Sequence, residues 1–278
     1  IAHPSLDVRL FRDRRLSASV GALALVFFGM GGVFFFTSFY LQNVRGYSPL
    51  AAGLLTVPFA AGQLVMSPRS AALVRTYGAK AAGATGLFVM AAAVAGYATL
   101  GVSSPIWLLG VLFGIQGAAM GVVMPAATSA VMDVLPRERA GAGSALTNTA
   151  RQVAVALSVA VLGSILAEFY RNSLSPSLAG LPASARDAAS SSISATQAVA
   201  QQLGASGRSL LAPANTAFVD AMHVTTLVAA ALALAGALVV LRWMPGKARP
   251  AEIPAGLEHE PELAIMEQEM LQTVEREV

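Results

Sequence analysis

The chain has 278 residues, of which 55% are hydrophobic and only 12% are charged, and its mean hydropathy is +0.64. Soluble globular domains carry about twice this share of charged residues, so the composition excludes an ordinary soluble domain and indicates a membrane protein. The absence of cysteine excludes disulfide and thiol chemistry. The net charge of +3 forms no basic soluble patch, so we expect no nucleic-acid partner.

The chain opens with residues 1–15, "IAHPSLDVRLFRDRR". This stretch is typical of a cytoplasmic linker, and it carries no signal-peptide pattern. It indicates that the sequence is part of a longer protein. The alternative is a trimmed or misassigned start.

Six apolar runs, each of 18 residues or more, follow the linker. Runs of this length predict membrane-spanning helices, so the expected fold is an all-α membrane domain over residues 16–244. The predicted spans are Leu16–Gln42, Ala51–Val74, Ala81–Gly101, Pro105–Met132, Ala142–Phe169 and Phe218–Arg242.

Two polar segments stand outside these spans. Residues 170–217 are rich in Ser and Ala, and we expect an exposed external loop with a surface helix near residues 196–203. Residues 245–278 form an acidic cytoplasmic tail that holds eight of the fifteen acidic residues. Apolar residues recur there at helical spacing, which predicts a short amphipathic helix on a solvated tail.

Lys and Arg near the span ends predict the orientation, because cytoplasmic loops are enriched in both. Eleven lie on the side of both termini and four on the side of the long loop. Both termini are therefore expected in the cytoplasm and the 170–217 loop outside. The first group is Arg9, Arg12, Arg14, Arg15, Arg75, Lys80, Arg137, Arg139, Arg242, Lys247 and Arg249, and the second is Arg45, Arg171, Arg186 and Arg208.

The fifth span carries an arginine about ten residues, or about 15 Å, from its start. At 100° per residue, Ser144, Asn148, Arg151 and Ser158 share one quarter of the helix surface. A charge within the bilayer faces a cavity, a water path or a partner helix. We expect Asn148 and Arg151 to face a central cavity or a second half, and the alternative is a purely structural contact.

Further candidate cavity residues lie in spans one, two and four. Phe34, Ser38 and Gln42 share one face of span one, and such a mixed aromatic and polar face suits apolar or cationic organic molecules. Span two contributes Gln63, and span four contributes Gln116 and Met120. Span four also carries a row of small residues that lets helices approach closely: Gly110, Gly114, Gly117 and Gly121.

No Asp or Glu lies in the middle of any span. A proton-driven carrier needs a titratable group in the membrane, and these spans offer no good candidate. We expect neither a metal site nor a bound cofactor. His223, near the external end of span six, is expected to be structural.

Several short motifs are similar to those of one transporter family. They are Tyr40-Leu41-Gln42, Gly46-Tyr47-Ser48-Pro49, Pro136-Arg137-Glu138-Arg139-Ala140-Gly141 and Asn148-Thr149-Ala150-Arg151-Gln152. Over residues 4–244 the chain resembles the carboxy-terminal half of a major facilitator superfamily transporter, in the fourteen-span drug:proton antiporter branch. The resemblance implies two inverted three-helix repeats, a proton gradient as the energy source, and an amino-terminal half that is missing here.

One loop departs from that family's pattern. Between spans two and three the family's "G-x-L-x-D-R-x-G-x-R" is replaced by "AALVRTYGAK". Gly78 and Lys80 match, whereas Arg75 and Thr76 stand at the Asp and Arg positions. The gating interaction that the Asp makes in the family is therefore in doubt in this half.

The leading interpretation is part of a multidrug exporter in the cell membrane that moves small, largely apolar or cationic organic compounds by proton antiport. One alternative is a non-transporting fragment or scaffold, or a half that needs a second chain. An intramembrane protease is disfavoured. Its Gly204-Ala205-Ser206-Gly207 pattern lies in a polar loop, and Ser144 and His223 are expected at opposite membrane surfaces.

Overall fold

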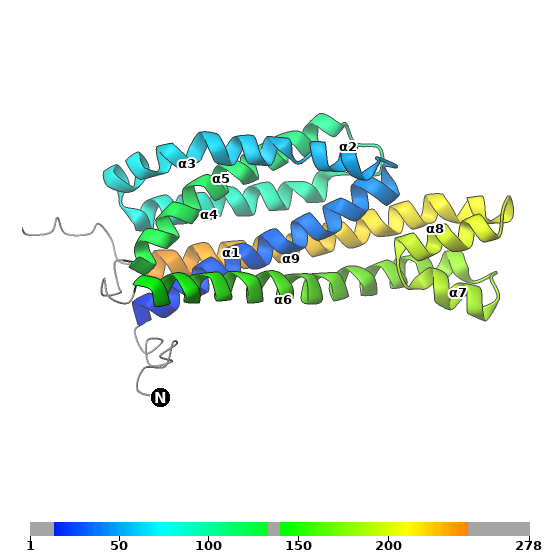
Figure 1. Ribbon diagram of the computed structural model, residues 1–278. Coiled ribbons are helices and arrows are strands. Elements are labelled where there is room, and N and C mark those ends of the chain that lie inside the picture. The colour runs from blue at the N-terminus through cyan, green and yellow to red at the C-terminus, as the bar shows by residue number, and fades with distance from the viewer. Residues whose placement is uncertain (1–13, 133–139, 244–278) are drawn as a thin grey trace, which may run out of the picture. The chain divides into compact units, whose positions relative to one another are not determined.

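The computed structural model describes residues 14–132 and 140–243, and these form a bundle of long helices with a smaller helical layer at one end (Figure 1). The predicted linker up to residue 13, the loop around Arg137 and Arg139, and the acidic tail lie outside the described residues. The long helices are α1 (Arg14–Phe39), α3 (Val57–Tyr77), α4 (Ala79–Gly96), α5 (Ile106–Met132), α6 (Ala140–Leu174) and α9 (Leu211–Trp243).

Each predicted span corresponds to one of these helices. Six helices of the described chain are long and apolar enough to cross a membrane, which confirms the all-α membrane fold. Shorter elements connect them. They are the π-helical turn η2 (Tyr40–Val44), α2 (Pro49–Leu54), η3 (Tyr97–Thr99), η5 (Ser175–Leu178), α7 (Ala183–Ser190), α8 (Ile193–Gln202) and η6 (Ser206–Leu210).

The packing of the six helices repeats itself. Helix α3 packs against α5 and α6 packs against α1, while α4 contacts α5 and α9 contacts α1. Exchanging α1 with α5, α3 with α6 and α4 with α9 leaves this set of contacts unchanged. Because the six helices alternate in direction, each helix runs opposite to its counterpart in the exchange (Figure 1). The packing is that of two inverted three-helix repeats.

The repeats interlock through a close helix pair. A Cβ added at Gly117 of α5 would lie 1.9 Å from the Phe59 carbonyl oxygen of α3, and one at Gly121 would lie 2.8 Å from that of Gln63. Gly62 of α3 approaches the Gly114 carbonyl of α5 in the same way. Small residues let these backbones touch, as the glycine row of span four predicts.

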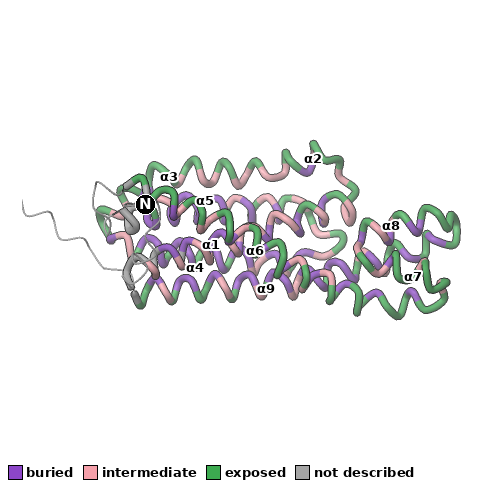
Figure 2. The backbone as a smooth tube through the Cα atoms, turned by 60° about the horizontal axis from the view of Figure 1, so that its bottom comes forward, coloured by how far each residue is buried: buried purple, intermediate pink, exposed green. Residues whose placement is uncertain are grey.

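Helices α3 and α6, which we call the flanking helices, are less buried than the other four long helices. Only 6% of the apolar window of α3 and 28% of that of α6 is buried, against 44–56% in the other spans. Figure 2 shows α3 mostly exposed or intermediate, whereas α1, α4 and α5 carry much more buried surface. Within the described chain, α3 and α6 therefore have the most surface free for lipid or another chain.

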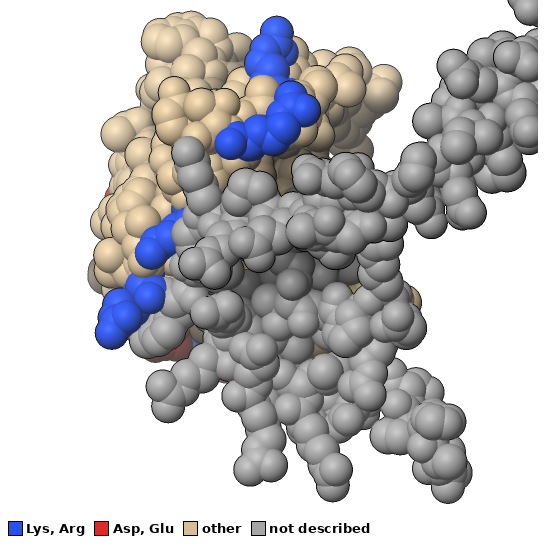
Figure 3. All heavy atoms as spheres, turned by 90° about the vertical axis from the view of Figure 1, so that its left-hand side faces the viewer, with Lys and Arg blue, Asp and Glu red and all other residues tan. Residues whose placement is uncertain are grey.

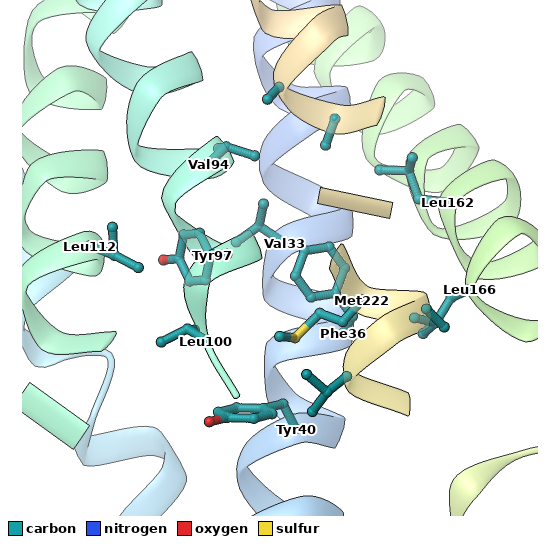
Figure 4. Packing of buried hydrophobic residues seen from close by; sticks show 14 of the residues in the cluster. Val33, Phe36, Tyr40, Val94, Tyr97, Leu100, Leu112, Leu162, Leu166 and Met222 are labelled. Atoms are coloured by element: carbon teal, nitrogen blue, oxygen red, sulfur yellow. The ribbon is translucent and has the colours of Figure 1, made fainter. Parts of the chain in front are cut away.

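The core lies where α1 meets α4, α5, α6 and α9. Phe36 of α1 and Met222 of α9 lie side by side in it, and Val33 lies between Tyr97 and Phe36 (Figure 4). Tyr40 and Tyr97 are almost completely buried, so their hydroxyl groups need partners inside the protein. The sites described below supply those partners.

Residues 170–217 are largely helical rather than an irregular loop. With 35 residues α6 is about 52 Å long and with 33 residues α9 is about 50 Å, so both outreach a hydrocarbon core of about 30 Å. The hairpin of α7 and α8 packs against their projecting ends, and α8 covers the stretch predicted as a surface helix. A buried hydrogen bond of 2.6 Å joins the hydroxyls of Tyr170 and Thr196. Burial of apolar residues on both sides of this bond orders the segment.

Basic side chains gather at the opposite end of the bundle, where α3 turns into α4. Figure 3 looks onto this end and shows Lys and Arg side chains over its described part. Arg75 and Lys80 belong to the turn, and Arg242 ends α9. The predicted cytoplasmic position of this end stays a prediction.

Candidate substrate cavity

A cavity of about 240 Å³ lies beside the carboxy-terminal half of α1. Three of the predicted residues, Phe34, Ser38 and Gln42, line it together, because they recur every four residues on one face of α1. The other lining residues come from α1, η2, α2, the turn that follows α2, and α5. They are Thr37, Leu41, Pro49, Ala52, Gly53, Thr56 and Phe113.

An aromatic cluster crosses four elements and contributes Phe34 and Phe113 to the wall of the cavity. The rings of Phe34 (α1) and Phe59 (α3) meet edge to face with centroids 5.1 Å apart. Phe34 also lies 5.7 Å from Phe113 (α5), which in turn meets Tyr97 (η3) at 5.8 Å. Edge-to-face pairs at these distances are favourable, so the ring of Phe34 is held in a defined position at the cavity.

Polar groups lie among these rings. The Gln42 side-chain amide donates a hydrogen bond of 2.9 Å to the Ser38 hydroxyl, one turn earlier. The Thr37 hydroxyl is buried and has no hydrogen-bond partner. A buried hydroxyl without a partner costs free energy, so Thr37 is suited to binding a polar group that enters the cavity.

The predicted residues Gln116 and Met120 lie deeper, within the packed bundle. Gln116 is fully buried, and its side-chain oxygen accepts a hydrogen bond of 2.9 Å from the Tyr97 hydroxyl. Its side-chain nitrogen has no partner. In Figure 4 the Tyr97 hydroxyl points toward the helix that carries Leu112, which is α5. This pair therefore links the third and fourth spans through Tyr97, which is also part of the aromatic cluster.

Gln63, Asn148 and Arg151 lie away from the 240 Å³ cavity. Gln63 is half-buried, and its backbone follows the close seam of α3 with α5. On α6, a guanidinium nitrogen of Arg151 donates a hydrogen bond of 2.7 Å to the Asn148 side-chain oxygen. The Arg151 guanidinium also lies over the ring of Phe27 on α1. The candidates thus separate into a cavity group, a buried pair and a group at the α1–α6 seam.

Three side chains fix the turn between α4 and α5 beside the end of α1. Tyr40 donates to the Gly101 carbonyl at 2.8 Å, and Arg45 donates to the carbonyls of Val102 and Ser104. A ring nitrogen of His223 lies 2.7 Å from the Leu100 carbonyl oxygen, and the structural role expected for this histidine stays a prediction. These bonds give the backbone carbonyls of this turn side-chain partners.

Thr37, Thr56 and Phe113 are among the cavity residues that sequence reasoning missed. Thr37 follows Phe34 by three residues, so helical spacing gives a usable signal for it. Phe113 lies beside Gly114 in an apolar run, and Thr56 falls in the turn between α2 and α3. Only the packing of α5 and α2 against α1 brings these two to the cavity.

The model of the Major Facilitator Superfamily matches residues 3–159 of the chain. The chain belongs to the Major Facilitator Superfamily. The matched segment includes all of α1 to α5 and about half of α6, and with them the cavity and the α1–α6 seam. As a member of this superfamily with six spanning helices, it is a multi-pass membrane protein.

Several bacterial relatives within this superfamily resemble the chain. It is 32% identical over 186 residues to the multidrug resistance protein Stp of Mycobacterium tuberculosis, covering 64% of this chain and 33% of that protein. It is 31% identical over 240 residues to the multidrug efflux pump LfrA of Mycolicibacterium smegmatis, covering 86% and 47%. It is 29% identical over 263 residues to the tetracenomycin C resistance and export protein of Streptomyces glaucescens, covering 90% and 48%. The chain spans about half or less of the length of these superfamily relatives.

Proposed function

We propose that this chain forms the carboxy-terminal half of a drug exporter in the bacterial cell membrane. Its cargo is small, largely apolar or cationic organic compounds. The relatives support this proposal, since their names include multidrug resistance, multidrug efflux and tetracenomycin C export. The chain's length relative to theirs supports a second half on the same or another chain.

The observation that carries the proposal is the cavity with an aromatic wall, a Gln42–Ser38 polar pair and a buried Thr37 hydroxyl without a partner. Ligand sites are mostly apolar, with a few placed polar groups, and their usual volume is about 300–1,000 Å³. At about 240 Å³ this cavity is slightly smaller. A second half that packs over the exposed flanking helices α3 and α6 would enlarge it and close it. Transport then follows from rocking of the two halves around a shared site.

Proton antiport is part of the proposal, and it assigns the proton carrier to the other half. Among the described residues, the acidic ones are Glu168, Asp187 and Asp220, and none of them lines the aromatic cavity. Glu168 pairs with Arg171 at 3.1 Å near the end of α6. The described part of the chain therefore supplies substrate contacts, and the titratable group that couples them to the proton gradient comes from elsewhere.

Transport also fits the chain better than catalysis. Ser206, in the motif that resembles a protease pattern, lies in η6, and a ring nitrogen of His223 is in contact with the Leu100 carbonyl. Ser144 lies in the first turns of α6, at the opposite end of the bundle from α8 (Figure 1). A nucleophile needs its base within hydrogen-bond reach, and these contacts and positions do not indicate such a pair.

Dye efflux tests the proposal in cells that carry the gene as it stands in its genome, so that any preceding half is included. Cells are loaded with ethidium, energised, and followed for loss of fluorescence. Phe34→Ala removes the central ring of the aromatic cluster, and we expect it to slow efflux by about tenfold, since one aromatic pair is worth about 0.5–1.5 kcal/mol. Phe88→Ala, at an exposed position on α4, is the matched control. Equal efflux rates in both variants at equal abundance would contradict the proposal.

A further inference from the structure

A second cavity, of about 590 Å³, lies next to the first, between the end of the first span and α8. We call it the outer vestibule. Its polar lining comes from η2, from α8 and from η6. The residues that matter for its chemistry are Gln42, Asn43, Gln197, Gln201 and Arg208.

Two hydrogen bonds fix α8 over the end of α1. The Gln197 side-chain amide donates to the Asn43 backbone carbonyl at 2.6 Å, and the Ser194 hydroxyl lies 3.3 Å from the Asn43 side-chain oxygen. These contacts join residues more than 150 positions apart in the chain. Helix α8, on one side of the outer vestibule, is therefore attached directly to η2, which continues the helix that carries Phe34 and Ser38.

The Gly204-Ala205-Ser206-Gly207 motif brings Arg208 to the outer vestibule, next to α8. Gly204 has φ +59°, a left-handed conformation that glycine adopts without steric cost, and it turns the chain back after α8. Gly207 lies so close to α8 that an added Cβ would be 2.1 Å from the Ala200 carbonyl oxygen. The two glycines thus fold η6 against α8 and place Arg208 on the wall of the outer vestibule.

Arg208 is the only ionisable residue among those that line the outer vestibule. Its guanidinium is exposed and makes no hydrogen bond or ion pair with the residues that the structure describes. The neighbouring Gln201 amide is likewise exposed. A guanidinium offers several donors in a planar fork that matches a carboxylate, and amides supply additional donors.

Gln42 lines both the outer vestibule and the aromatic cavity. Gln42 therefore lies at the boundary between the two cavities. We infer that the outer vestibule is a binding site for organic anions, in which Arg208 pairs with a carboxylate or enolate while the apolar part of the molecule lies toward Gln42. Anion binding at this site goes beyond the proposed cargo of apolar or cationic compounds and does not rest on the proposed function.

Binding to purified, full-length protein in phosphatidylcholine nanodiscs tests this inference. The probe is carboxyfluorescein, and rhodamine 6G is a cation with a related ring system. Arg208→Gln should weaken carboxyfluorescein binding by about tenfold or more, the effect of losing one charge-assisted hydrogen bond, and should leave rhodamine binding unchanged. Arg208→Lys should retain part of the affinity, because it keeps the charge but loses the fork. Arg186→Gln, an exposed arginine of α7 outside the vestibule lining, is the matched control.

Three results would overturn the inference. They are an absence of carboxyfluorescein binding to the unaltered protein, equal losses in Arg208→Gln and Arg186→Gln, and loss of the binding when phosphatidylglycerol is added to the nanodiscs. The last result would identify a lipid headgroup, rather than a soluble anion, as the occupant. Ethidium efflux separates this inference from the proposed function. If the protein binds carboxyfluorescein but exports no ethidium, the proposed export function is contradicted and the inference about anion binding is not.

Discussion

The guanidinium carbon of Arg151 on α6 lies 5.5 Å from the centre of the Phe27 ring on α1. A cation over an aromatic face is attracted by the ring's quadrupole, and the same guanidinium also donates to Asn148. Arg151 remains only partly buried. Its charge is therefore fixed at the α1–α6 seam, where part of it stays available to a substrate or to another chain.

We expect Arg151→Ala to reduce transport per folded molecule, and Arg151→Lys to reduce it less. Lys keeps the charge but not the planar fork. The free energy of unfolding should fall by no more than about 2 kcal/mol, because a partly exposed cation–π contact and one hydrogen bond each contribute about 1 kcal/mol. Abundance, melting temperature and efflux are measured for each variant. Arg171→Ala, in an exposed ion pair on the same helix, is the control. Normal efflux per molecule in Arg151→Ala would show that its role is purely structural.

The hydrogen bond between Tyr97 and Gln116 predicts a measurable coupling inside the membrane. Tyr97→Phe leaves the Gln116 side chain with no partner among the described residues. It should lower the free energy of unfolding by about 0.6 kcal/mol, the average for such bonds in bilayers, and by no more than about 1.7 kcal/mol. In Gln116→Leu, the further change Tyr97→Phe should cost less. A double-mutant cycle from unfolding in mixed micelles gives the coupling energy. Additive effects of the two changes would rule out a stabilising bond.

The seam between α3 and α5 predicts opposite sensitivity at two glycines of one helix. Gly117→Ala places a methyl group 1.9 Å from the Phe59 carbonyl oxygen and should destabilise the protein by about 1–3 kcal/mol. Gly114→Ala meets nothing closer than 3.8 Å, so it should be neutral or slightly stabilising. Melting temperatures of the two purified variants make the comparison. If Gly114→Ala were the more harmful change, the two helices would not pack in this way.

The predicted orientation can be tested by cysteine labelling, because the chain has no cysteine of its own. Ser184 of α7 and Thr76 at the end of α3 are both exposed and lie at opposite ends of the bundle. A membrane-impermeant maleimide added to intact cells should label Ser184→Cys and not Thr76→Cys. Permeabilised cells should show labelling of both. The reverse pattern in intact cells would invert the topology that the distribution of Lys and Arg predicts.

The sequence alone determined the six spans and the face of α1 that lines the cavity. Spans are decided by long apolar runs, and Phe34, Ser38 and Gln42 share a face because a helix repeats every 3.6 residues. The glycine row in span four likewise predicted a close helix contact, since small residues matter only where backbones meet. These features depend on local periodicity, so one sequence is enough to find them.

Only the tertiary structure decided which residues meet across helices. Phe59 and Phe113 join Phe34 from other helices, and Gln116 turns out to be paired with Tyr97 within the bundle. Apart from the surface helix expected near residues 196–203, the helical layer over residues 170–217 was not predicted, because the polar composition suggested a loop. Its order depends on contacts such as Gln197 with Asn43, whose positions are 154 residues apart. Such contacts arise from the packing of whole helices, which no local pattern encodes.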